Sequence, residues 1–150
     1  NVSKIRFHNT NQIIMSIVDK IRILFEGKQP LYEEGEFKPG QTWLFQTKEN
    51  NNACKLIILK CETLNEQSII HIAIKTSDSM SDEFLIQHLP MSKEAIEHSV
   101  ITLQETDTVL SDYTEGYRQW RTAFDKGEAG VWEIAVCDVL EAVMQFKQQF

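Results

Sequence analysis

The chain has 150 residues, of which 42% are hydrophobic and 25% are charged, and its formal net charge is −7. This composition is that of a globular domain and excludes an intrinsically disordered chain. The excess of acidic residues argues against direct binding to nucleic acid, because an acidic surface repels the phosphate backbone. Three cysteines, an odd number, favour a reducing compartment, so we expect a cytoplasmic protein.

Charge is divided unevenly along the chain. Residues 1 to 28 carry five Lys or Arg against two Asp or Glu, whereas residues 29 to 150 carry 10 against 20. Apolar residues recur at helical spacing from Ile13 to Phe25, which predicts an amphipathic N-terminal helix within residues 1 to 28. No apolar run reaches the ~20 residues that a membrane-spanning helix needs, so we expect no membrane span.

Alternating and apolar patterns predict a strand meander over residues 42 to 89. Asn65 and Glu66 are expected to form the turn between its second and third strands, both of which are apolar on two faces and therefore central in the sheet. The four expected strands span residues 42–48, 53–62, 69–74 and 84–89.

Residues 92 to 150 are expected to form helices with one further short strand. Ser92 is a candidate N-cap for a helix whose apolar stripe includes Ile96, Val100 and Leu103. The short strand is expected at residues 131–135.

Two more helices are predicted in this C-terminal part. One carries Tyr117, Trp120 and Phe124 on a single face and ends near Gly127, where a left-handed residue is favoured. The last helix carries Leu140 and Val143 on its apolar side. Together these patterns predict a single α+β domain over residues 1 to 150, with a mainly antiparallel sheet of four to five strands and helices from both chain ends packed on it.

No catalytic motif and no metal-binding motif is present in the sequence. His88, His98 and Glu94 form a loose group without the ligand spacing of a zinc site. His71 lies between two isoleucines of a strand and is expected to be a hydrogen-bonded structural histidine on the opposite face from them. We therefore expect no metal, no cofactor and no requirement for a disulfide.

The three tryptophans, and two arginines of the C-terminal part, allow more than one interpretation. Trp43, Trp120 and Trp132 each lie on an apolar face of an expected element and are predicted to be core residues. In the alternative, Trp43 and Trp132 line a pocket with His71, and the protein binds a small ligand or is an enzyme. Arg118 and Arg121 are expected to pair with the neighbouring acidic stretch from Glu105 to Glu115. In the alternative, these two arginines contact an anion.

Two short acidic spans in predicted loops contain seven carboxylates and no cation. Loops on a rigid scaffold often display binding residues, and carboxylates attract a basic protein partner. The seven candidate partner-binding residues are Asp78, Asp82, Glu83, Glu105, Asp107, Asp112 and Glu115.

Several segments are together similar to a group of small uncharacterised bacterial proteins over residues 35 to 145. These segments are PGQTW at 39–43, IIHI at 69–72, HLPMSKEA at 88–95, GYRQW at 116–120 and GEAGVW at 127–132.

Some small acidic proteins of this general kind are immunity proteins of contact-dependent growth inhibition or polymorphic toxin systems. By this analogy of size, charge and class, the protein would be a non-enzymatic inhibitor that neutralises a bacterial toxin. Its partner would be a basic protein such as a nuclease. Carboxylates of the inhibitor would occupy the basic cleft of this partner by mimicking phosphate.

Overall fold

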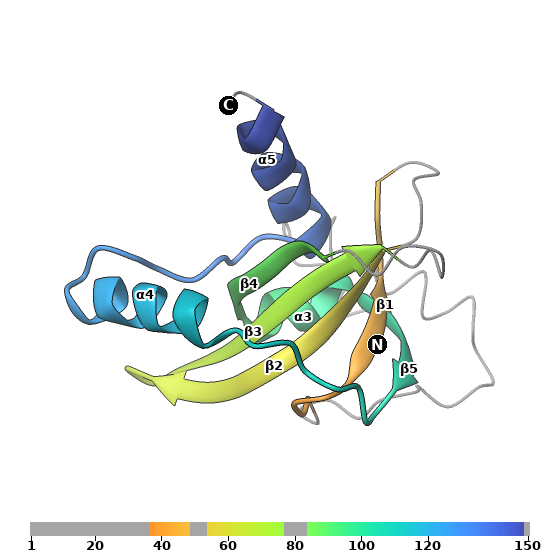
Figure 1. Ribbon diagram of the computed structural model, residues 1–150, viewed down its shortest axis with the longest axis horizontal. Helices are drawn as coiled ribbons and strands as arrows, with labels where there is room; N and C mark the ends of the chain where they lie inside the picture. The colour runs from red at the N-terminus through yellow and green to blue at the C-terminus, as the bar shows by residue number, and fades with distance from the viewer. Residues whose placement is uncertain (1–36, 49–53, 77–83, 149–150) are drawn as a thin grey trace, which may run out of the picture.

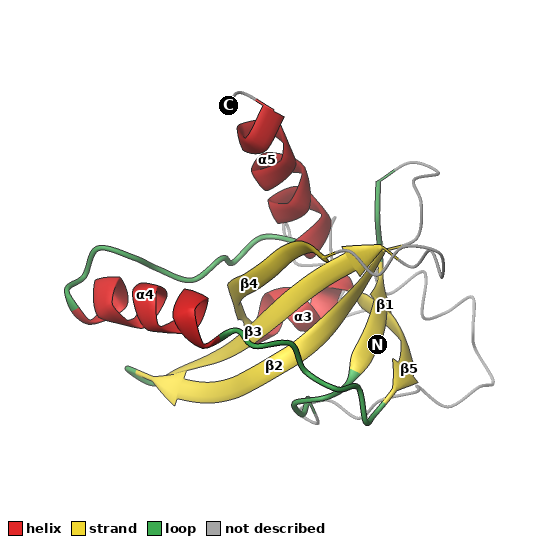
Figure 2. Ribbon diagram, in the orientation of Figure 1, coloured by secondary structure: helices red, strands yellow, loops and turns green. Residues whose placement is uncertain are grey.

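The fold is built around a five-stranded antiparallel sheet with the strand order β4-β3-β2-β1-β5 (Figures 1 and 2). The computed structural model describes residues 37–48, 54–76 and 84–148. The predicted α+β class with a mainly antiparallel sheet is confirmed. The elements are β1 (Thr42–Phe45), β2 (Cys54–Leu64), β3 (Gln67–Thr76), β4 (Phe84–Ser92), α3 (Lys93–Ser99), β5 (Val100–Glu105), α4 (Thr114–Asp125) and α5 (Val136–Gln148).

Two predicted features lie outside the described residues. One is the amphipathic helix within residues 1 to 28. The other is the acidic span that holds Asp78, Asp82 and Glu83.

The hairpin of β2 and β3 forms the centre of the sheet. Isoleucine recurs in both strands and favours β-structure, because its β-branched side chain packs well on a pleated, buried surface. The predicted turn is confirmed: Asn65 and Glu66 have φ values of 50° and 65°, as a two-residue hairpin turn with two left-handed residues requires. Glu66 therefore adopts a conformation that glycine would adopt with less strain.

The two faces of the sheet are covered differently. One face holds the main core, where Trp43, Leu56 and Ile72 pack with Ile96 of α3 and Val139 of α5. On the second face Leu110 and Tyr113 pack against a smaller buried group. In Figure 1 the chain between β5 and α4 crosses in front of the strands, whereas α3 lies behind them. The buried group of the second face consists of Ile57, Leu59 and Ala73.

A β-bulge in β2 changes which side chains share the second face. Ile58 pairs with Ile72 and Lys60 pairs with His71, so Leu59 is an extra residue without its own partner in β3. Because side chains alternate along a strand, one extra residue moves every later side chain to the other face. The bulge therefore brings Glu62 to the face that carries His71.

The helix predicted across Ile96, Val100 and Leu103 is shorter than expected. Ser92 caps α3 as predicted, since its hydroxyl accepts a hydrogen bond of 3.1 Å from the Ala95 amide. The helix ends at Ser99, and Val100 is already extended with ψ 147°. β5 follows and pairs with β1, because the β-branched residues from Val100 onward fit an edge strand that tertiary pairing stabilises.

The prediction of a short strand at residues 131–135 is wrong. A single parallel bridge joins Trp132 to Met91, with hydrogen bonds from the Trp132 amide to the Pro90 carbonyl and from the Ser92 amide to the Trp132 carbonyl. The chain then turns into α5, so this contact fixes the link between α4 and α5 without extending the sheet.

Helix α4 ends near Gly127, as predicted, and Gly127 has a left-handed backbone. Gly127 has φ +74°, and its amide donates to the Phe124 carbonyl at 2.9 Å. The Glu128 amide donates to the Ala123 carbonyl at 2.8 Å, which completes a Schellman motif.

The C-terminal helix α5 leaves the sheet after its first turns. Val136 and Val139 are buried in the main core, whereas Phe146 near the other end is 61% exposed. Figure 1 shows α5 directed away from the strands. Among the described residues, we find no helix with the length and apolar content that a membrane crossing demands.

Candidate functional site

The acidic connection, defined as residues 105 to 115, is held against the sheet at two places. Near its start, the Thr108 amide donates to the Gly40 carbonyl at 2.9 Å, and the Thr108 hydroxyl contacts that of Thr42. Near its end, the Tyr113 hydroxyl donates to the Leu59 carbonyl at 3.2 Å. The connection is therefore a fixed loop on a sheet.

Gly40 allows the close approach at the first of these places. Gly40 has φ +93°, and a Cβ atom there would lie 3.1 Å from the Thr106 carbonyl oxygen. Both the left-handed backbone and the tight contact favour glycine. The Pro39-Gly40 pair in the sequence is the signal for this geometry.

The side chains on either side of Thr108 point to solvent. Thr108 is directed toward the sheet, so its neighbours Asp107 and Val109 face outward. Val109 is 92% exposed, although most large apolar side chains in the described residues are at least partly covered. The connection thus presents an apolar side chain flanked by carboxylates.

The other carboxylates of the connection make local contacts. Asp112 accepts a hydrogen bond of 3.0 Å from the Thr114 amide at the start of α4, and this bond holds the pKa of Asp112 below its ordinary value. Glu115 accepts from Gln119 and pairs with Arg118, and both contacts lower the pKa of Glu115. Asp112 and Glu115 therefore also stabilise the first turn of α4.

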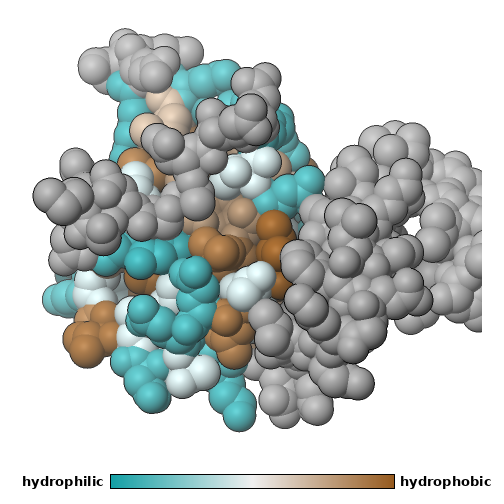
Figure 3. Space-filling model, turned by 90° about the vertical axis from the view of Figure 1, so that its right-hand side faces the viewer, coloured by the Kyte–Doolittle hydropathy of each residue, from teal (hydrophilic) through white to brown (hydrophobic). Residues whose placement is uncertain are grey.

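The predicted site residues are thus partly brought together. Glu105, Asp107, Asp112 and Glu115 are all exposed along one connection, and the Glu105 carboxylate accepts a hydrogen bond of 3.1 Å from Thr108. Figure 3 views the side of the molecule with β1 and β5, where hydrophobic areas lie among hydrophilic ones.

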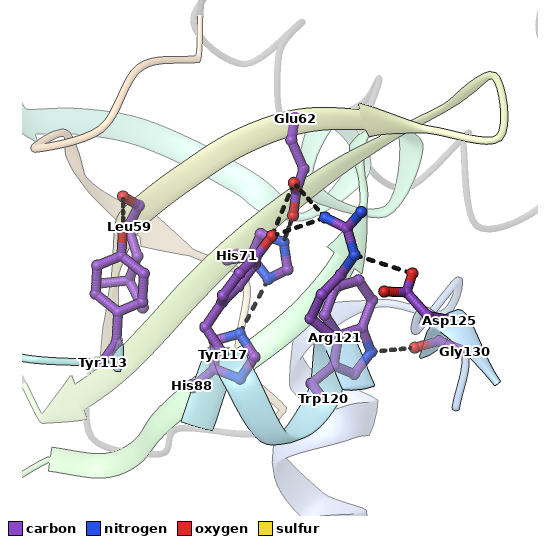
Figure 4. A network of polar contacts seen from close by, with 10 residues as sticks. All are labelled: Leu59, Glu62, His71, His88, Tyr113, Tyr117, Trp120, Arg121, Asp125 and Gly130. Atoms are coloured by element: carbon purple, nitrogen blue, oxygen red, sulfur yellow. Dashed lines mark hydrogen bonds and ion pairs between the residues drawn. The ribbon is translucent and has the colours of Figure 1, made fainter. Parts of the chain in front are cut away.

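A buried polar network lies on the second face under α4 (Figure 4). His71 has a fully buried side chain, and its Nε2 lies 2.6 Å from Oε2 of Glu62. Its Nδ1 lies 2.9 Å from Nε2 of His88 on β4. With Glu62 ionised, Nε2 of His71 donates to the carboxylate, and Nδ1 of His71 accepts from Nε2 of His88. The prediction of a hydrogen-bonded His71 on the face opposite its isoleucine neighbours is confirmed.

Helix α4 completes this network. The Tyr117 hydroxyl donates to Oε1 of Glu62 at 3.0 Å and accepts from Arg121 at 3.2 Å. Arg121 also lies 3.6 Å from Oε1 of Glu62, and its Nε donates to Asp125 at 3.0 Å. The Trp120 indole donates to the Gly130 carbonyl at 2.8 Å. The contacts from His71, Tyr117 and Arg121 satisfy both oxygens of the nearly buried Glu62 carboxylate.

The environment of the two histidines keeps them neutral at pH 7. Burial lowers the pKa of His71, although the hydrogen bond and the charge of Glu62 oppose this effect. Burial and the adjacent His71 ring lower the pKa of His88 to about 4. A neutral ring donates one hydrogen bond and accepts one, which matches the network observed.

The two arginines of α4 behave differently. Arg118 pairs with Glu115 of the acidic connection, as predicted. Arg121 pairs with Glu62 and Asp125 instead, so the prediction that it pairs with the acidic connection is wrong.

His88, His98 and Glu94, the loose group noted in the sequence, do not lie together in the fold. His88 lies on the second face of the sheet, whereas His98 and Glu94 belong to α3, which packs on the main-core face. Within residues 37–48, 54–76 and 84–148, we find no group of three or more His, Cys, Asp or Glu side chains arranged to hold a metal ion.

The three cysteines are free thiols, and desolvation of the sulfur atom raises the pKa of each. Cys54 is buried, as its apolar run suggests. Cys61 is exposed and donates a long hydrogen bond of 3.4 Å to the Phe37 carbonyl.

The residues of the alternative pocket are not neighbours. Trp43 is fully buried in the main core, His71 lies on the opposite face, and Trp132 is 38% exposed beside β4. The expectation that all three tryptophans are core residues holds for Trp43 only. A shallow cavity of about 210 Å³ lies elsewhere, between the β2–β3 hairpin and Lys93, and is smaller than the usual ligand pocket of roughly 300–1,000 Å³.

Sequence reasoning missed Glu62 and Val109. Glu62 reaches His71 only because of the bulge at Leu59, and no residue type in this apolar run signals a bulge. Val109 is one apolar residue in a polar loop, and its exposure depends on Thr108 facing the sheet. No protein-family model, curated protein or solved structure matches this chain.

Proposed function

We propose that this protein is a non-enzymatic, protein-binding inhibitor that uses the acidic connection to bind a basic partner. In this proposal it is a cytoplasmic immunity protein, and the partner is a bacterial toxin such as a nuclease. The observation that carries the proposal is the 92% exposure of Val109 on a loop that is fixed at both ends and bears four carboxylates.

The arrangement suits protein binding for two physical reasons. A fixed loop loses little conformational freedom on binding, so less of the contact energy is spent on ordering it. An exposed apolar side chain on a loop that also bears carboxylates combines an anchor that becomes buried with charges that speed association.

An enzyme is the other candidate, and the chain from Glu62 through His71 to His88 favours it, because hydrolases orient a catalytic histidine with a carboxylate. However, a base acts best when its pKa is near the working pH, and the pKa of His88 is about 4. We therefore propose the inhibitor and assign the network a structural role.

The proposal is tested by protection from toxicity. The product of the gene next to this coding sequence is expressed in a bacterial host, alone or with this protein, and growth is measured. We expect the wild-type chain to restore growth and the double variant Asp107→Lys, Val109→Asp to lose that effect. Glu128→Lys, a charge reversal at an exposed residue after α4, is the matched control and should protect like wild type. Equal protection by the double variant would contradict the proposal.

A further inference from the structure

The contact between α4 and the sheet is concentrated on the histidine pair, defined as His71 and His88. No residue of α4 is buried. The rings of Tyr117 and Trp120 meet the His71 ring edge to face, with centroids 5.0 Å and 4.9 Å away. They also meet the His88 ring, at 6.2 Å and 6.4 Å. The helix therefore rests on these two imidazoles.

We propose that the histidine pair is a pH-sensitive contact that holds α4 on the sheet, and that acidification releases α4. The hydrogen bond of 2.9 Å between the rings needs one donor and one acceptor, and in the neutral pair Nε2 of His88 donates to Nδ1 of His71. A proton added to Nδ1 of His71 would place two donors opposite each other. The bond could then survive only if His88 exchanged its own proton to its other nitrogen.

A proton added to His88 meets a second obstacle. Gly116 lies over His88, and a Cβ atom at Gly116 would be 3.2 Å from the His88 Cβ and 3.7 Å from its Nδ1. Gly116 belongs to the first turn of the 12-residue helix α4. The amino end of a helix carries partial positive charge, which disfavours a cation beside it. Moving α4 away from the sheet gives a charged His88 access to water.

The charges around the pair offset this effect only in part. Glu62 favours a protonated His71, but its two oxygens already accept from His71 and Tyr117, and Arg121 lies beside it. β3 and β4 supply the two histidines themselves. The titratable or charged groups that β2 and α4 direct to this region are Lys60, Glu62, Tyr117, Arg121 and Asp125.

The sign of the pH dependence of α4 docking follows from the direction of the two histidine pKa shifts. The pKa of each docked histidine lies below its ordinary value of 6.5, so the released state binds protons more tightly. Docking of α4 is therefore complete above pH 6.5 and weakens as the pH falls toward 4. The main-core face, where α3 packs through apolar side chains such as Ala95 and Ile96, lacks such a pair in the described residues and should remain packed.

Hydrogen exchange of the full chain at pH 7.0 and pH 5.0 tests this inference. After correction for intrinsic exchange rates, we expect the protection of α4 amides to fall at least about 10-fold and to lie below that of β2 and β3 amides at pH 5.0, because the β2 and β3 amides exchange only through global unfolding. Equal α4 protection at both pH values would overturn the inference. Equal protection of α4, β2 and β3 amides at pH 5.0 would also overturn it, since α4 would then open only by global unfolding.

Two variants and one direct measurement complete the test. His88→Gln keeps a donor for His71 but cannot titrate, so the fall in α4 protection should be at least about threefold smaller. His98→Gln changes a histidine on the other side of the sheet and should leave the α4 profile unchanged. The ring resonances of the wild-type histidines are followed by NMR and need no variant. An apparent pKa at or above 6.5 for both His71 and His88 would overturn the inference.

Discussion

The rings of His71 and His88 are nearly parallel, with an interplanar angle of 14° and centroids 5.1 Å apart, and they share a hydrogen bond of 2.9 Å on the second face of the sheet. The bulge at Leu59 adds Glu62 to the same face. A carboxylate, two imidazoles and a phenol thereby form one partly buried chain of hydrogen bonds, which is strong when every member is satisfied and costly when one is lost.

The first prediction concerns the stability of the whole chain against pH. Because burial lowers the pKa of both histidines in the fold, their contribution is fully present above pH 6.5 and is lost as the pH falls toward 4. We expect the melting temperature to fall by about 5 °C between pH 7.5 and pH 5.0, measured by circular dichroism. The double variant His71→Gln, His88→Gln should show a smaller fall. An equal melting temperature at both pH values in the wild type would contradict the role of the pair.

The second prediction concerns coupling between Tyr117 and Glu62. Tyr117→Phe removes a donor from a nearly buried carboxylate and should cost about 1–2 kcal/mol of unfolding free energy. A double-mutant cycle with Glu62→Ala should give a coupling energy of about 1 kcal/mol, because this change removes the oxygen that accepts from Tyr117. Tyr113→Phe is the matched control. Its hydroxyl donates to a backbone carbonyl instead, so its effect should add to that of Glu62→Ala. If the effects of Tyr117→Phe and of the change at Glu62 on the unfolding free energy simply add, the hydrogen bond between these two side chains contributes nothing to stability.

The third prediction concerns the hairpin turn. Glu66 has φ 65°, where a side chain is strained, so Glu66→Gly should raise the unfolding free energy by about 1 kcal/mol. Ser68→Gly, in the adjoining strand, provides the comparison and should lower it, since glycine weakens a strand interior. Urea unfolding measures both. A loss of stability in Glu66→Gly would show that the Glu66 side chain supports the hairpin.

The fourth prediction concerns the fit of α4 on the sheet. Gly116→Ala would place a Cβ atom 3.2 Å from the Cβ of His88, which the strand backbone holds in place. Overpacking should outweigh the better helix propensity of alanine and destabilise the fold by about 1 kcal/mol. A Cβ at Gly130 would meet nothing within 4 Å, so Gly130→Ala should change stability by less than about 0.5 kcal/mol. Both values come from thermal or urea unfolding, and a stabilised Gly116→Ala would contradict the tight fit.

Local chemistry explains which parts of the fold were predictable. The apolar runs of β2 and β3, the Asn65 turn, the Ser92 cap and the left-handed Gly127 each depend on residues close together in the sequence. β5 was mistaken for helix because Val100 and Leu103 fit a helical stripe as well as a strand. Its pairing with β1, more than 50 residues earlier in the chain, decides between them.

The acidic connection and the network of Glu62 and His71 were predictable to different degrees. The carboxylates of the acidic connection were found because charge is visible in the sequence, but the outward position of Val109 depends on how Thr108 packs. The link from Glu62 to His71 was not predictable, because a one-residue bulge reverses the face that strand periodicity assigns to Glu62.

The central claim is that the acidic connection binds a basic protein partner, and the most direct test is the dissociation constant measured by calorimetry at 50 mM and 300 mM salt. The partner is the toxin that the growth assay identifies. We expect Val109→Thr to weaken binding about 10-fold at both salt concentrations, because a hydroxyl replaces a methyl group that becomes buried. Asp107→Lys should weaken binding mainly at low salt and so reduce the salt dependence, because salt screens exposed charges. Glu128→Lys should behave like wild type. If both changes in the connection leave the dissociation constant and its salt dependence unaltered, the connection is not the binding surface.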